Sequence, residues 1–253
     1  MTAQNQPARE TYPWPRVLTG CFLVIICWAI GVSREYPEQT TRKLQTLEHY
    51  VFSQLWSRLS SHSHARIHPH QKPLWQQLHG NVLEIGPGYG DALQYMRPPI
   101  NYVALEPNQF LHPRLEHNIK KRGLTPVIVN GTLDSSIVPQ EVLDNAPYDF
   151  VVTSLVLCSV RNVEANLQAI YRLLRPGGKY VFIEHVHHAD GAWRTVQSLV
   201  SKVAWPFIGN CHFDRDTGSM IKQLKWHVDY TLVSEATSIE TRLTPLIIGT
   251  ATK

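Results

Sequence analysis

A turn with glycine at every second position follows a short apolar segment and could bind a ligand through its backbone. The apolar segment is 82–85, and Gly86, Gly88 and Gly90 follow it. Glycine adopts positive φ and has no Cβ, so a ligand can approach such a turn closely. Where a strand ends in this turn and a helix follows, free N–H groups face a binding site. The spacing is G-x-G-x-G, which differs from the G-x-G-x-x-G of dinucleotide-binding proteins.

An acid at the end of the next apolar segment supplies a second ligand-binding group. Residues 102–105 are largely apolar, and Glu106 follows them, twenty residues after Gly86. At this distance a carboxylate at a strand end can accept hydrogen bonds from both hydroxyls of a ribose. Together, the glycine turn and Glu106 predict a site for a ribose-containing ligand much more strongly than either does alone.

These groups can meet only if one sheet carries them, and the sequence alternates between strand and helix patterns accordingly. Helices are expected at 92–96, 109–122 and 163–174, and strands at 81–85, 101–105, 126–130, 150–157 and 179–185. This alternation predicts an α/β fold with a parallel sheet and right-handed crossovers. Two further strands, 228–234 and 246–251, have no convincing helix between them and are expected to form an antiparallel hairpin at the sheet edge.

Length and composition fit one α/β domain with an extension. The chain has 253 residues, of which 43% are hydrophobic and 17% charged, so a sizeable core is expected. The net charge of +4 and the lack of long basic runs give no indication of nucleic-acid binding. The cysteines form no C-x-x-C pair, which argues against a disulfide framework or a zinc site and fits a reducing compartment. They are Cys21, Cys27, Cys158 and Cys211.

The N-terminal part, residues 1–36, is expected to be a polar lead followed by a membrane anchor. The anchor would be 17–32, a run of sixteen residues without a charge. A bilayer span usually needs about 20 apolar residues, and Tyr12, Trp14 and Tyr36 could lengthen this short run as interfacial anchors. A cleaved signal peptide and a buried helix are the alternatives. Flanking positive charges lean slightly toward a cytosolic C-terminal part.

Residues 37–72 are expected to connect the anchor to a folded domain that spans 73–253. Apolar residues at helical spacing predict a helix over 38–59 that caps the domain or lies at the membrane surface. The His-rich segment 61–71 contains Pro69 and has no acid or cysteine nearby. A solvated linker is therefore favoured there over a metal site.

Four motifs occur in order within residues 80–186: the turn 84–90, Glu106, the strand 148–152 and the segment 174–178. In type, order and spacing they resemble the motifs of the class I S-adenosylmethionine-dependent methyltransferases. The resemblance implies a Rossmann-like sheet of seven strands, mostly parallel with the last strand antiparallel. It also implies S-adenosylmethionine as the cofactor.

The resemblance assigns cofactor contacts residue by residue. The glycine turn would face the amino-acid part of the cofactor, Glu84 its ammonium group and Glu106 its ribose hydroxyls. Residues after the third strand stand where the family contacts adenine, and those at the end of the fourth would lie under the cofactor. The expected cofactor-binding residues are Glu84, Gly86, Gly88, Gly90, Glu106, Gly131, Thr132, Ser154 and Leu155.

A closer resemblance rests on segments 155–160, 184–186 and 209–215, which are similar to the membrane-anchored thiol methyltransferases of animals. It implies methyl transfer to a small, apolar acceptor, with a thiol favoured, by an enzyme of the endoplasmic reticulum membrane whose catalytic domain is cytosolic. Fungal enzymes that methylate amines or hydroxyls of secondary metabolites are also similar, so N- or O-methylation is the alternative. A non-catalytic membrane protein and a dehydrogenase are weaker hypotheses, because the glycine turn is intact and lacks dinucleotide spacing. No oligomeric state is predicted.

The candidate catalytic residues are those that could take a proton from an acceptor thiol, amine or hydroxyl. His185, at the end of the fifth strand, could act as a general base, because histidine is the side chain type that ordinarily changes charge near neutral pH. His212 and Asp214 are a second candidate pair, in which Asp214 could orient His212 or bind the acceptor. Alternatively, His185 only bonds backbone and Asp214 tethers a loop. Cys158 is interpreted as a packed small residue, because the transfer needs no covalent intermediate.

Overall fold

The computed structural model describes residues 42–134, 137–204, 208–233 and 238–253. The expected anchor at 17–32 lies outside these ranges. Within them, no helix combines the length and the apolar character that crossing a bilayer requires.

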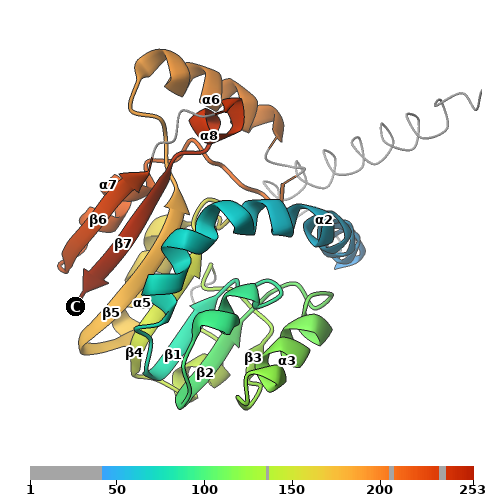
Figure 1. Ribbon diagram of the computed structural model, residues 1–253, viewed down its shortest axis with the longest axis vertical. Coiled ribbons are helices and arrows are strands. Elements are labelled where there is room, and N and C mark those ends of the chain that lie inside the picture. Colours follow the sequence, from blue (N-terminus) through green and yellow to red (C-terminus); the bar gives the residue numbers. More distant parts are fainter. Residues whose placement is uncertain (1–41, 135–136, 205–207, 234–237) are drawn as a thin grey trace, which may run out of the picture.

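One sheet of seven strands forms the centre of the described chain (Figure 1), in the order β3-β2-β1-β4-β5-β7-β6. The strands are β1 (Gly80–Ile85), β2 (Ile100–Leu105), β3 (Ile128–Val129), β4 (Tyr148–Ser154), β5 (Leu174–His185), β6 (His227–Val233) and β7 (Leu246–Thr252). Strands β1 to β5 pair in parallel, whereas β7 is antiparallel to both β5 and β6. The predicted seven-stranded sheet with its C-terminal hairpin is confirmed.

The helices agree less well with the sequence patterns. They are α2 (Arg42–Trp75), the 3-10 helix η2 (Asp91–Tyr95), α3 (His112–Lys121), α4 (Gln140–Asp144), α5 (Val163–Leu173), α6 (Gly191–Ala204), α7 (Thr217–Lys222) and α8 (Ile239–Leu243). Helices α4, α6 and α7 were not among the predicted elements. The absence of a helix between the last two strands was a wrong prediction, because α8 lies there. Its start is fixed by a capping box between Ser238 and Thr241.

Helix α2 contains the segment predicted to be a solvated linker, and that prediction is wrong. The helix continues through the histidines and through Pro69 and Pro73. Proline removes a backbone donor and disfavours helix, but Ile67 and Gln71 of this stretch are almost fully buried. Burial of one face therefore outweighs local propensity, and the helix extends sixteen residues beyond the predicted end at Leu59. In Figure 1, α2 passes over the arrowhead ends of the central strands.

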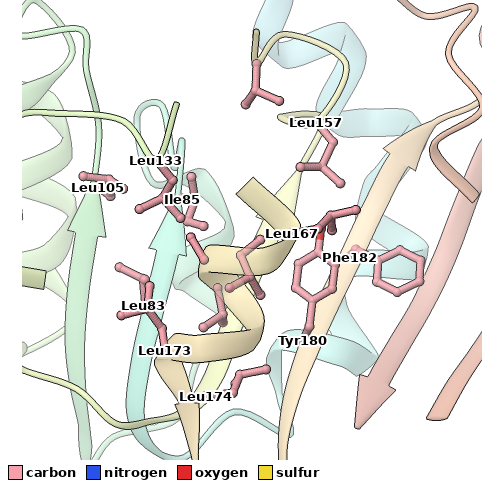
Figure 2. Close-up of a cluster of buried hydrophobic side chains, with 14 of the residues drawn as sticks. Leu83, Ile85, Leu105, Leu133, Leu157, Leu167, Leu173, Leu174, Tyr180 and Phe182 are labelled. Carbon is pink, nitrogen blue, oxygen red and sulfur yellow. The ribbon is translucent and has the colours of Figure 1, made fainter. Parts of the chain in front are cut away.

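The sheet is covered by apolar side chains on both faces. Figure 2 shows the layer beneath α5, where Leu167 and Leu173 pack beside Leu83 of β1 and Phe182 of β5. The neighbour of Leu83, Val82, belongs to the cluster on the opposite face. This alternation follows from the pleat of a strand, and strands buried on both faces read as continuous apolar runs.

Candidate active site

A cavity of about 490 Å³ lies at the carboxyl ends of the parallel strands and beneath α2. Its volume falls within the range of small-molecule sites. The chain builds β2 and β3 on one side of β1 and then β4 on the other. Parallel α/β sheets bind ligands at this point, just outside the carboxyl ends of the strands.

The glycine turn after β1 forms the floor of the cavity. Gly86 and Gly88 have φ of 62° and 61°, a left-handed conformation that is costly for other residues. A Cβ on Gly86 would lie 2.8 Å from Cγ2 of Val156, and one on Gly88 would lie 3.2 Å from Nε1 of Trp56. Both glycines line the cavity, whereas Gly90 does not and instead caps the start of η2.

Glu106 follows β2 directly, and its carboxylate is hydrogen-bonded to the glycine turn. Its Oε2 accepts a hydrogen bond from the N–H of Gly88 at 3.0 Å, and its Oε1 accepts one from the N–H of Asn108 at 2.9 Å. Burial raises the pKa of Glu106 to about 7, although these two hydrogen bonds lower it. A carboxylate has about four acceptor positions, so two remain for the hydroxyls of a ribose.

Two further buried polar groups at the cavity fit a ligand that carries an ammonium group. Tyr102 donates its hydroxyl hydrogen bond to Oε2 of Glu84 at 2.7 Å, which orients this acid at the wall. Gln71 of α2 also lines the cavity, and its buried Oε1 has no hydrogen-bond partner among the described residues. An unpaired buried acceptor costs about 1–3 kcal/mol, so a ligand donor would be favourable here.

The loops after β3 and β4 complete the polar side of the cavity. Gly131 and Thr132 line it after β3, and Ser154, the last residue of β4, lines it together with Leu155. Leu155 has a φ of 59°, which turns the chain sharply and ends β4 three residues before the predicted end of the strand. Asp134 was not among the predicted site residues; its Oδ1 accepts hydrogen bonds of 2.8–3.2 Å from the backbone N–H groups of Arg161 and Asn162, just before α5, and from the side-chain amide of Asn166 in α5.

The two residues that end β5 have different surroundings. Glu184 is fully buried, and its Oε2 accepts hydrogen bonds from the N–H groups of Val156 and Leu157 at 3.0 and 2.9 Å. It therefore holds the loop after β4 in place, and burial raises its pKa to about 8. His185 is partly buried and lines the cavity, where an acceptor could reach it.

The other two candidate catalytic residues lie elsewhere. Neither His212 nor Asp214 is among the described residues that line the cavity. Oδ1 of Asp214 accepts a hydrogen bond from the hydroxyl of Ser201 at 2.7 Å, which ties its loop to α6. The backbone N–H of His212 donates to the carbonyl of Cys158 at 2.8 Å. A catalytic role for these two residues stays a prediction.

Cys158 and Cys211 meet beside His185, although the three residues lie far apart in the sequence. The Sγ of Cys211 is 3.0 Å from the Sγ of Cys158 and 3.4 Å from Nδ1 of His185. The hydrogen bond from Cys211 lowers the pKa of Cys158 below the ordinary thiol value. No short-range motif reveals this grouping, because each residue follows a different strand or loop.

Helix α2 supplies an apolar roof, which was not among the predicted parts of the site. Phe52, Leu55 and Trp56 line the cavity, together with Ile67 from further along the helix. The rings of Phe52 and Trp56 are stacked with their centroids 5.7 Å apart. Their i, i+3, i+4 spacing predicts an apolar helix face, but it does not indicate what that face covers.

The roof is fastened at both ends of the cavity. The hydroxyl of Tyr89, in the glycine turn, donates to the carbonyl of Ser53 at 3.0 Å. On the other side, the guanidinium of Arg66 donates to Oγ1 and to the carbonyl oxygen of Thr244, just before β7, at 2.6 and 2.8 Å. One helix therefore links the glycine turn to the far edge of the cavity.

The fold and the strand-end site define a methyltransferase that uses S-adenosylmethionine. The family model described as "Methyltransferase domain" matches residues 49–235, and the chain belongs to this family. The match begins within α2. The predicted enzyme class is confirmed, and so is the predicted cofactor, whose sulfonium supplies an electrophilic methyl group.

Named relatives agree with this class. Thiol S-methyltransferase TMT1B of Homo sapiens is 30% identical over 179 residues, which cover 66% of this chain and 71% of that protein. TMT1B of Rattus norvegicus is 27% identical over 195 residues, which cover 69% of this chain and 78% of that protein. The YcgJ protein of Bacillus subtilis has the same fold, with a TM-score of 0.56 at 12% identity over 73% of this chain and 98% of its own.

Proposed function

We propose that the protein methylates the thiol of a small apolar acceptor. The observation that carries this proposal is that polar groups and apolar side chains line the same cavity. Its polar lining, the glycine turn and Glu106 (the cofactor half), suits the cofactor, and the apolar side chains of α2 (the acceptor half) suit a hydrophobic acceptor. The similarity to relatives named thiol S-methyltransferases supports sulfur as the acceptor atom.

In this proposal the chain positions the acceptor and helps it to lose a proton. Positioning supplies much of the rate when a nucleophile must approach a methyl group in line. The side chains of Phe52 and Trp56 would hold the acceptor, and Glu106 with the glycine turn would hold the cofactor. A thiol has a pKa of about 8.5, so it is only partly ionised at neutral pH. His185 lines the cavity and could assist the loss of its proton.

The direct test is to supply the protein with S-adenosylmethionine and matched thiol, amine and phenol acceptors that share one apolar body. We expect methylated product from the thiol and little from the others, with micromolar cofactor binding by calorimetry. Methylation of the amine or the phenol alone would contradict the thiol acceptor and would support N- or O-methylation of secondary metabolites instead. Cofactor binding without any product from the three would count against a small apolar acceptor.

We expect Trp56→Ala to raise the KM for an apolar thiol about tenfold, because it removes a large apolar wall of the acceptor half. A small polar thiol should show almost no change in KM. The control is Leu47→Ala, which truncates an exposed residue of the same helix outside the cavity wall. An equal rise in KM for both thiols would assign Trp56 to general stability rather than to acceptor binding.

We also propose that residues 1–36 attach the enzyme to a membrane, with 17–32 as the anchor and with the domain on the cytosolic face of the endoplasmic reticulum. The uncharged run and its aromatic flanks support this proposal. An apolar acceptor would concentrate in the lipid beside such an enzyme.

Removal of residues 1–36 is expected to shift the protein from the membrane pellet to the supernatant while it keeps activity on a soluble thiol. Removal of residues 1–16, which spares the apolar run, is the control and should leave the protein in the pellet. A 1–36 deletion that still sediments with membranes would contradict the anchor.

A further inference from the structure

Three side chains at the acceptor end of the cavity have the chemistry of a zinc site. The Sγ atoms of Cys158 and Cys211 and a ring nitrogen of His185 all lie within 4.8 Å of one another. Cys158 follows β4, His185 ends β5, and Cys211 belongs to the loop before α7. Two thiolates and one imidazole form a set of ligands that binds zinc in preference to harder cations such as Mg²⁺.

The distances need little adjustment to hold an ion. With Zn–S bonds of about 2.3 Å in a tetrahedral site, two sulfurs stand roughly 3.8 Å apart. The sulfurs here are 3.0 Å apart, and Sγ of Cys211 is 3.4 Å from Nδ1 of His185. A change of less than about 1 Å in the S···S distance would therefore create the site, through small side-chain rotations.

The surrounding structure buries both cysteines and fixes the backbone beside Cys158. Cys158 is fully buried and Cys211 is 8% exposed. The guanidinium of Arg215 donates hydrogen bonds of 2.7 Å to the carbonyls of Leu157 and Val160, on either side of Cys158 in the sequence. The N–H of His212, next to Cys211, donates to the carbonyl of Cys158 at 2.8 Å, which ties the two cysteine segments together.

The fourth position of such an ion would face the acceptor. Cys211 and His185 both line the cavity, whereas Cys158 stands behind them. Zinc with three protein ligands and an open fourth position is the arrangement of catalytic rather than structural sites. From this geometry we propose that Cys158, His185 and Cys211 bind one Zn²⁺ whose open position takes the acceptor thiol as a thiolate.

This inference rests on the proposed thiol acceptor and gives His185 its part in the reaction as a metal ligand. The acceptor thiol would displace a water from the zinc and release its proton to solvent. The zinc-bound sulfur would then form the new S–CH₃ bond as the S–CH₃ bond of the cofactor breaks. The neutral thioether product is a weak ligand, so water would displace it and restore the site. No oxidant or reductant is required.

The first test measures metal in the full chain, purified without chelator. We expect one zinc per chain by mass spectrometry of the metal content. Protein stripped by a chelator should take up one equivalent of zinc chloride, and Co²⁺ in its place should show thiolate-to-metal absorption that changes when an apolar thiol is added. Wild-type protein that holds no zinc and takes up none would overturn the inference, as would a Cys158–Cys211 disulfide in the native protein.

Variants locate the ion and separate it from the rest of the fold. Cys211→Ser and Cys158→Ser should lose the zinc but keep the wild-type affinity for S-adenosylmethionine. The matched control, Cys27→Ser, makes the same change in the proposed anchor and should keep the metal. Retention of one zinc by Cys211→Ser would exclude this site. The Co²⁺ spectrum of the wild type decides the question even if a variant does not fold.

The pH profile of activity separates this inference from the proposed function. At pH 6.5 about 1% of a thiol with a pKa of about 8.5 is ionised, so stripping the zinc should slow thiol methylation up to about 100-fold. At saturating cofactor, where the effect of Glu106 on binding does not limit the rate, the loaded enzyme should show a nearly flat rate from pH 6.5 to 8.5. Equal rates and profiles with and without zinc would refute the metal's role and leave the thiol acceptor intact. Bound zinc without any thiol methylation would refute the acceptor and leave the site intact.

Discussion

Replacement of Glu106 with glutamine is expected to weaken S-adenosylmethionine binding about a hundredfold or more. Both oxygens of this buried carboxylate already accept backbone hydrogen bonds, and its remaining lone pairs face the cavity. Hydrogen bonds to a charged group contribute about 1.5–3 kcal/mol each, so weakening two of them gives a loss of this size. Glutamine keeps the volume of the side chain and should keep the fold.

Calorimetric titration of both proteins with the cofactor measures this loss. The control, Glu116→Gln, makes the same chemical change at an exposed acid of α3 that pairs with Lys120. It should bind the cofactor as the wild type does. Normal affinity in Glu106→Gln would remove the ribose-binding role from this residue.

The raised pKa of Glu106 makes cofactor binding depend on pH. Because the free protein holds this carboxyl with a pKa of about 7, protonation competes with the cofactor as pH falls below that value. We expect the affinity to fall by up to about tenfold per pH unit between pH 7 and pH 5.5. The Glu106→Gln variant lacks the group and should show a flatter profile, which also corrects for titration of the cofactor itself.

Glu106 also affects the stability of the ligand-free protein, and the pH dependence of stability is opposite to that of cofactor binding. A carboxyl whose pKa is raised on folding stabilises the folded state below the unfolded value of 4.5 and loses that contribution as pH rises to about 7. Removing the group by Glu106→Gln should therefore raise the melting temperature of the free protein at pH 8 more than at pH 5. Equal shifts at both pH values would mean that Glu106 is not neutral in the free protein at low pH.

Gly88→Arg is expected to abolish cofactor binding. Gly88 combines a positive φ with a Cβ position 3.2 Å from Trp56, and its N–H donates to Glu106. Any side chain would press against the roof, and an arginine would fill the cavity where the cofactor must lie. The left-handed backbone alone costs roughly 1–2 kcal/mol for a residue other than glycine.

Gly123→Arg separates these two effects. Gly123 has a φ of +72°, and no described atom outside its chain neighbours lies within 4 Å of the position that a Cβ would take there. This glycine therefore shares the backbone cost of Gly88 without the crowding. Both variants should lose the stability that the left-handed backbone costs, but only Gly88→Arg should fail to bind the cofactor in calorimetry. Loss of binding in both would point to a general effect of backbone strain.

The sheet and the cofactor half of the site could be predicted because their signals are local. The predicted strand 150–157 is apolar at six of its eight positions, a pattern typical of a strand buried on both faces. The glycine turn and Glu106 each follow such a run, so the parallel sheet brings them together. In the structure, all the expected cofactor-binding residues except Gly90 line one cavity.

The acceptor half could not be predicted because its residues depend on long-range packing. Pro69 and the histidines argue locally against a helix, yet contacts of Ile67 and Gln71 extend α2 through them. The grouping of Cys158, His185 and Cys211 likewise arises from where three separate segments end. The spacing of residues in the sequence cannot predict such a cluster unless the whole topology is known.

The attachment of α2 at both ends of the cavity makes the two binding events interdependent. Ser53 of the roof accepts a hydrogen bond from Tyr89 in the turn that faces the cofactor, and Arg66 donates one to Thr244 at the other side. A cofactor that orders the turn would also order the apolar wall for the acceptor. The acceptor would then bind to a wall that is already ordered, and its binding would cost less conformational entropy. Linkage requires the effect to be reciprocal, so an apolar thiol should tighten cofactor binding by the same factor by which the cofactor tightens thiol binding.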